Sequence, residues 1–276
     1  MASLSALFVR WSDAPSMVLV FYRMFFASAV VVPATLILCR DDLLGMRRED
    51  VLLSILSGIV FAVHFATYFE SLDHISIASC LVLTDTAVFF VAVIMAVFFG
   101  ESVSKKGWAI IAMTFGGCVI ISLSDMNLGT GLLGDGFALI SAFMFALNTI
   151  FGRKVRCRVS TLAYTSVLYS TAALVSLIII AADDISALDC GTNNLLCGLG
   201  LAVFCTLLGH SIFNWGLKFE KAAFVALTTL LEPVFGTAMG LVLFGEVPGI
   251  LVLVGGVVVL AGVVLFSKVT EPEESS

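Results

Sequence analysis

Continuous apolar stretches of about twenty residues recur along the chain, separated by short polar segments. They lie at roughly 15–38, 51–70, 75–99, 106–123, 131–152, 160–182, 195–217, 222–244 and 247–267. About twenty apolar residues in a helix span a bilayer, whereas barrel strands alternate over about ten. The pattern therefore predicts nine spanning helices. A further apolar stretch, Met1–Val9, is too short to span, and we interpret it as a truncated first helix.

The composition places these helices in lipid. Hydrophobic residues make up 60% of the 276 residues and charged residues 12%, against roughly 25% charged residues in soluble domains. Such a chain cannot cover itself with a water-facing surface, so we predict an all-α, polytopic membrane helix bundle. No basic stripe indicates nucleic acid. The seven cysteines lack metal-ligand spacing, so we expect no metal site and no cofactor.

The loop charges predict an orientation. Lys and Arg fall in alternate loops, namely Arg40, Arg47 and Arg48, then Lys105 and Lys106, Arg153 to Arg158, Lys218 and Lys221, and Lys268. The loop near 183–194 carries aspartates instead. The positive-inside rule puts the basic loops and the C-terminus in the cytoplasm, and we expect a bacterial inner membrane.

The second half of the chain repeats the first. Segments 78–119 and 223–264 share identical residues at a constant offset of 145, namely Ala78/Ala223, Thr84/Thr229, Phe90/Phe235, Val97/Val242, Phe99/Phe244, Gly100/Gly245, Glu101/Glu246, Gly117/Gly262 and Val119/Val264. Counting the stub, each copy has five helices, and an odd number inserts the second copy upside down. We therefore predict an inverted repeat, with halves at 1–124 and 125–269 and an acidic disordered tail at 270–276.

Several motifs resemble one known family. The run Leu231-Glu232-Pro233-Val234-Phe235, followed by Leu243-Phe244-Gly245-Glu246, resembles the ninth-helix pattern of the drug/metabolite transporter superfamily, in particular its EamA-like families. The segment Gly209 to Trp215 is similar to a pattern of some bacterial members. Two departures are the stub and Val88, which stands where a proline would match Pro233. The resemblance implies transport, often export, of amino acids and related metabolites.

Arg23 and Asp85 are the first candidate substrate-binding residues. Both lie about 12 to 14 Å from the outer face by helix rise, so we expect them to meet. One interpretation has Arg23 bind a substrate carboxylate, with Asp85 as its resting counter-ion. The other is a structural ion pair. Tyr68, Asn148 and Asn214 could orient substrate or join helices through hydrogen bonds.

Glu232, His64 and His210 are candidates for proton coupling. Glu232 stands directly before Pro233, which frees backbone polar groups in a helix. A carboxylate in mid-membrane can carry a proton, but neighbouring donors could also hold it as a structural group. His64 and His210 occupy nearly equivalent points of the two halves, where a proton relay and plain packing are both open.

A secondary transporter working by alternating access is the function that these features favour. The alternative is a non-transporting membrane scaffold or binding protein. The sequence carries no nucleotide-binding loop, HExxH motif or nucleophile–base pair, so we do not expect an enzyme. Expected partners are a small-molecule substrate, the lipid bilayer and H⁺. The face Gly236-x-x-x-Gly240 fits either a homodimer or packing within one chain.

Overall fold

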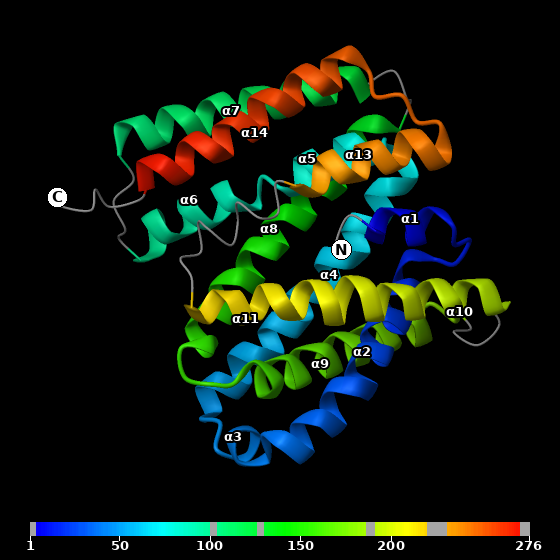
Figure 1. Cartoon of the computed structure of the whole chain (residues 1–276), viewed down its shortest axis with the longest axis vertical. Helices are drawn as coiled ribbons and strands as arrows, with labels where there is room; N and C mark the ends of the chain where they lie inside the picture. The colour runs from blue at the N-terminus through cyan, green and yellow to red at the C-terminus, as the bar shows by residue number, and fades with distance from the viewer. Residues whose placement is uncertain (1–3, 100–103, 126–129, 186–190, 220–230, 271–276) are drawn as a thin grey trace. The chain divides into compact units, whose positions relative to one another are not determined.

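A computed structural model describes residues 4–99, 104–125, 130–185, 191–219 and 231–270. These residues form helices and short connections, without strands (Figure 1). The helices are α1 (Leu4–Arg10), α2 (Ser16–Leu38), α3 (Arg40–Leu44), α4 (Arg48–His74), α5 (Ile77–Thr84), α6 (Ala87–Phe99), α7 (Lys105–Asp125), α8 (Gly131–Arg156), α9 (Thr161–Ala182), α10 (Gly191–Gly200), η2 (Leu201–His210), α11 (Ser211–Phe219), α13 (Leu231–Phe244) and α14 (Ile250–Thr270).

The predicted membrane character is confirmed. Within the described ranges, six helical segments are long and apolar enough to cross a membrane, namely Ser16–Leu38, Arg48–His74, Ile77–Ile94, Gly131–Arg156, Thr161–Ala182 and Gly191–Gly216. Shorter apolar helices cover Phe235–Phe244 and Ile250–Phe266. Gly100, Glu101, the first part of the span predicted at 222–244 and nearly all of the predicted tail lie outside the described residues.

Serine side chains begin two of these helices. The hydroxyl of Ser160 accepts a hydrogen bond from the backbone N–H of Ala163 at the start of α9. Ser76 does the same for Ser79 at the start of α5. Each serine satisfies a backbone donor that the first turn of a helix leaves without an intrahelical partner.

The span predicted at 75–99 is not one regular helix, because it is interrupted at Asp85 and Thr86. The N–H of Thr86 bonds to the carbonyl of Leu83, three residues back, at 3.2 Å. The Thr86 hydroxyl donates to the same carbonyl at 2.6 Å. A threonine hydroxyl that bonds a nearby carbonyl competes with the regular helical pattern. The interruption therefore falls directly beside a candidate site residue.

The segment from Gly191 to Phe219 is continuous, and its middle is a π-helix. At the end of η2 the backbone N–H of Ser211 bonds to the carbonyl of Thr206, five residues back. π-Helical turns inside α-helices are rare and frequently mark functional sites. Hydrophobic periodicity gave no sign of this change.

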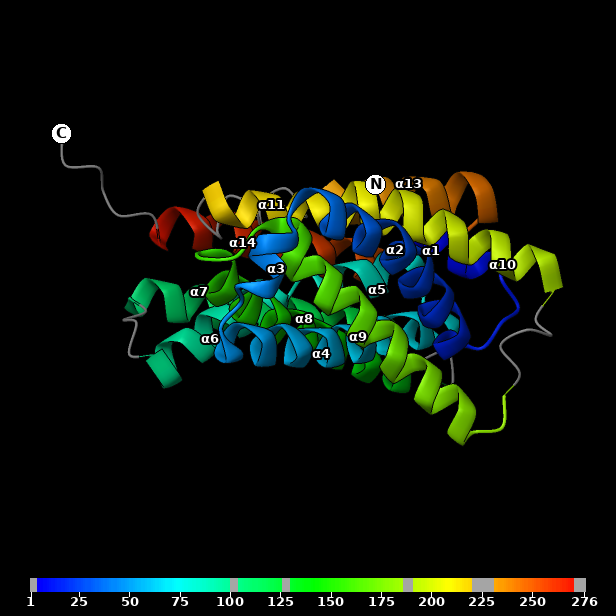
Figure 2. The same cartoon turned by 90° about the horizontal axis from the view of Figure 1, so that it is seen from below.

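The described helices group into two compact units. One comprises residues 1–69 and 147–220, and the other comprises 70–146 and 221–276. In the first unit α2 packs along α9 and against α10 and η2. In the second unit α7 packs along α14 (Figures 1 and 2), and α5 against α13. Each unit thus combines segments from both predicted sequence halves.

The packing of α7 on α14 reflects the repeat. A methyl group added to Gly117 would lie 3.0 Å from Cγ2 of Val259, and one added to Gly262 would collide with Thr114. At the repeat offset of 145 residues, Gly117 is equivalent to Gly262, and Thr114 is equivalent to Val259. Each contact is therefore the image of the other, as a two-fold relation between two repeats requires.

The face of Gly236 and Gly240 packs within the chain. A methyl group added to Gly236 would collide with Leu81, and one at Gly240 would lie 3.5 Å from Ile77 Cδ1. Both contacted residues belong to α5, in the same unit as α13. Close approach of α13 to α5 accounts for the small residues on this face.

Candidate functional site

Arg23 lies fully buried on α2 in the first unit, and two hydroxyls and an aromatic ring contact its guanidinium. Its Nε donates a 2.7 Å hydrogen bond to the hydroxyl of Thr206. Its Nη1 donates a 3.0 Å bond to the hydroxyl of Ser5. The guanidinium carbon lies 3.7 Å from the centre of the Phe65 ring. A cation held by two hydroxyls and an aromatic face keeps its charge and its forked donor geometry.

Both candidate histidines of the first unit pack around the same aromatic residue. The rings of His64 and Phe65 are 4.7 Å apart, and those of Phe65 and His210 are 5.4 Å apart, edge to face. The His64 ring also stacks on Tyr68 at 6.3 Å. Arg23, His64 and His210 are therefore brought together around Phe65, and Tyr68 joins them through His64. Phe65 was not among the residues predicted from the sequence.

Asn214 belongs to the rim of this cluster. Tyr169, buried on α9, shares a 3.0 Å hydrogen bond with the Ser211 hydroxyl and also hydrogen-bonds Asn214. Arg23 is within electrostatic reach of Tyr169. Tyr169 thus hydrogen-bonds Ser211 and Asn214 and interacts electrostatically with Arg23 in the first unit.

Asn148 belongs to a separate polar network of that unit. The hydroxyl of Ser57 donates to Oδ1 of Asn148 at 2.6 Å. Because that bond uses the only hydroxyl hydrogen of Ser57, the 2.6 Å contact with Tyr164 has the tyrosine as donor. Ser57, Asn148 and Tyr164 are all buried. These two hydrogen bonds join α4, α8 and α9. Hydrogen bonds of this kind hold helices together in lipid.

One predicted loop cation is instead buried. Arg156 is 1% exposed, and its Nε donates to the backbone carbonyl of Asn214 at 3.1 Å. Its Nη1 donates to the carbonyl of Val159. Nearby, Arg158 pairs at 2.9 Å with Asp50, which is buried. Arg156 thus binds the backbone within α11, and Arg158 binds a side chain in the first turn of α4.

Asp85 and Glu232 lie in the second unit and interact electrostatically with each other. Asp85 directly follows α5, where the helix is interrupted, and Glu232 lies in the first described turn of α13. Oδ2 of Asp85 is buried without a hydrogen-bond partner among the described residues. Two carboxylates that interact in a low-dielectric medium favour sharing one proton over carrying two negative charges.

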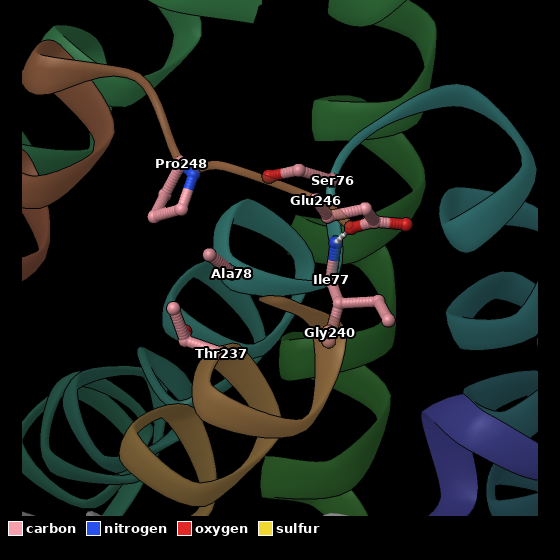
Figure 3. A pocket seen from close by; sticks show the side chains of 7 residues that line it. All are labelled: Ser76, Ile77, Ala78, Thr237, Gly240, Glu246 and Pro248. Atoms are coloured by element: carbon pink, nitrogen blue, oxygen red, sulfur yellow. Dashed lines mark hydrogen bonds between the residues drawn. The ribbon is translucent and has the colours of Figure 1, made fainter. Parts of the chain in front are cut away.

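Glu246 closes a small cavity at the start of α5. Its carboxylate accepts a 3.0 Å hydrogen bond from the backbone N–H of Ile77 (Figure 3). The cavity of about 10 Å³ is lined by Ser76, Ile77, Ala78, Thr237, Gly240, Glu246 and Pro248. That volume accommodates about one water molecule. The cavity is too small for a metabolite, so Glu246 caps the helix there.

Sequence reasoning overlooked the hydroxyl partners of Arg23. Ser5 lies in the stub that we treated as a helix remnant, and Thr206 lies inside an apolar run. A polar residue within an apolar span was the available signal for Thr206. No group of three or more metal-ligating side chains occurs in the part of the chain that the structure describes.

The apolar helices and the buried charged groups define a polytopic helical membrane protein. The chain belongs to the EamA-like transporter family, whose profile matches residues 1–123 and 132–268. The resemblance inferred from the motifs around Glu232 and Glu246 is thereby confirmed.

Named relatives and a solved structure agree with this assignment. The pseudopaline exporter CntI of Pseudomonas aeruginosa is 24% identical over 88% of this chain and 84% of its own. A probable amino-acid metabolite efflux pump of Salmonella typhimurium is 32% identical over 63% of this chain and 62% of its own. A crystal structure with 17% identity matches 96% of this chain and 92% of its own at a TM-score of 0.70, which shows the same fold.

Proposed function

We propose that this protein is a secondary transporter that exports small carboxylate-bearing metabolites, such as amino acids or related compounds, by alternating access. The family supports transport. The exporter and efflux-pump names of its relatives favour the outward direction. We place the protein in a bacterial inner membrane with its C-terminus in the cytoplasm, because of the alternating loop charges.

The observation that carries the proposal is the neutral hydroxyl support of the buried Arg23 guanidinium. A carboxylate binds guanidinium with charge-assisted, often bidentate hydrogen bonds, which are roughly twice as strong as neutral ones. A substrate carboxylate can therefore replace a hydroxyl when access opens. His64, Tyr68, His210 and Asn214 surround that position with ring and amide groups that would orient the rest of the substrate.

Proton coupling is assigned to Asp85 and Glu232. The two carboxylates interact electrostatically, and Oδ2 of Asp85 is buried without a hydrogen-bond partner among the described residues. Interacting carboxylates titrate as a pair and can carry one proton between them. Release of that proton on one side of the membrane and uptake on the other would drive export against a gradient. His64 and His210 remain candidates for a relay or gate beside Arg23.

Purified protein in proteoliposomes tests this function. The assay measures uptake of radiolabelled amino acids, N-acyl amino acids and dicarboxylates, each with and without an imposed pH gradient. Uptake of at least one carboxylate compound, accelerated by the gradient and saturable, is the expected result. Transport restricted to compounds without a carboxylate would overturn the role of Arg23, and a rate insensitive to the gradient would overturn proton coupling.

A further inference from the structure

The hydrogen bonds of Thr206 have a defined direction. Nε of Arg23 can only donate, so the 2.7 Å contact makes the Thr206 oxygen an acceptor. The single hydroxyl hydrogen is then left for the carbonyl of Leu201, at 3.3 Å. Arg23 is thus connected through one buried hydroxyl to the backbone of η2.

The π-helix permits this connection. In an α-helix a threonine hydroxyl reaches the carbonyl three or four residues back, as Thr165 does toward Thr161 at 2.8 Å. Leu201 is five residues before Thr206. The wider π-turn therefore brings the Thr206 hydroxyl within reach of the Leu201 carbonyl. In the same segment, the backbone carbonyl of Thr206 accepts a hydrogen bond from the N–H of Ser211.

Three contacts among the described residues restrict the orientation of the Arg23 guanidinium. The Phe65 ring lies 3.7 Å from the guanidinium carbon, and Thr206 holds Nε at 2.7 Å. Ser5 contacts the opposite end, at Nη1. If a substrate carboxylate replaced the Ser5 hydroxyl, it would bind the Nη1–Nη2 edge of the guanidinium. Nε would keep its hydrogen bond to Thr206.

We propose that Thr206 is a positioning residue, which holds Arg23 through Nε so that the Nη1–Nη2 edge receives the substrate carboxylate. The inference rests on the proposed function. It assigns to the π-helix a role in substrate recognition that neither the family nor the relatives' names supply.

The first test measures whether the hydroxyl works through Arg23. Melting temperatures in detergent are compared for wild type, Thr206→Val, Arg23→Met and the double variant. Thr206→Val should lower the melting temperature in wild type, since the buried guanidinium loses its acceptor. In the Arg23→Met background, Thr206→Val should have little effect on the melting temperature. Equal losses in both backgrounds would overturn the contact.

The second test measures recognition in proteoliposomes, with the anionic amino-acid and dicarboxylate panel as probes. Thr206→Val should raise KM roughly tenfold with kcat within about twofold of wild type. Thr206→Ser, which keeps the hydroxyl, should restore most of the affinity. Thr165→Val, which removes a buried hydroxyl of α9, should leave KM unchanged.

The outcomes separate the two proposals. An unchanged KM in Thr206→Val, or a similar rise in Thr165→Val, would overturn the positioning role while transport stands. A wild-type protein that moves none of the anionic probes would overturn the proposed function. The melting cycle would then still decide whether Thr206 holds Arg23.

Discussion

Gly262 of α14 lies directly against the side chain of Thr114 on α7, and there is no room for a methyl group between them. The repeat offset maps this contact onto the one between Gly117 and Val259 in the same helix pair. The two copies of the repeat therefore meet at two equivalent contacts, each between a glycine of one helix and a side chain of the other. Small residues at such crossings let helix backbones pack closely in lipid.

Alanine at these glycines should therefore destabilise the second unit. We expect Gly262→Ala to cost about 2 kcal/mol and Gly117→Ala about 1 kcal/mol, because overpacking forces neighbours to move. Gly116→Ala is the matched control, since a methyl group there meets nothing within 4 Å, and alanine is the better helix former. Chemical or thermal unfolding in detergent measures the differences. Equal stability of all three variants would contradict the contact.

Arg23 should bind substrate through both charge and shape. Arg23→Met is expected to weaken binding of an anionic substrate by roughly 2–4 kcal/mol. Arg23→Lys keeps the charge but loses the forked donors, so it should recover only part of that affinity. Uptake kinetics in proteoliposomes give KM for each variant, and melting temperatures identify any that fail to fold. Folded variants with wild-type KM would place the substrate elsewhere.

Glu232→Gln should abolish the effect of a pH gradient on transport while sparing substrate binding, because the amide cannot release a proton. Asp85→Asn should have the same effect if the two carboxylates share one proton. Glu70→Gln is the control, since Glu70 is a 44% exposed carboxylate of the same unit. Transport at two pH gradients, with binding measured separately, checks this. A persistent gradient effect in both site variants would exclude the pair from coupling.

The orientation in the membrane can be measured with cysteines. Cys157 is exposed near the end of α8, among the basic residues that we place in the cytoplasm. In a background without other cysteines, a membrane-impermeant maleimide should reach Cys157 only after the cells are broken. A cysteine placed at Asp183, which follows α9, should react in intact cells. The reverse pattern would invert the topology.

Glu246 should stabilise the start of α5. Glu246→Ala removes the acceptor of the Ile77 N–H and is expected to cost about 1 kcal/mol, the usual value of a helix cap. Glu246→Gln keeps an acceptor oxygen and should cost less. Hydrogen exchange at Ile77 and Ala78, read by mass spectrometry, reports the cap directly. Identical exchange in the alanine variant and wild type would show that the bond contributes nothing.

The sequence by itself determined the class, the apolar membrane-spanning stretches and the internal repeat. Twenty-residue apolar stretches have few solutions in lipid, because every backbone polar group must bond within its own segment. The repeated residues, such as Glu101/Glu246 and Gly117/Gly262, are visible at a fixed offset regardless of packing. The family assignment follows from the same local patterns.

Only the tertiary structure decided which polar residues meet. Ser5 and Thr206 are 201 positions apart in the chain, yet both hydroxyls contact Arg23. Hydrophobic periodicity records which residues prefer lipid or protein, but it does not record how far each helix is rotated about its axis. The interruption at Asp85 and the π-turn at Thr206 depend on individual hydrogen bonds that change the backbone locally.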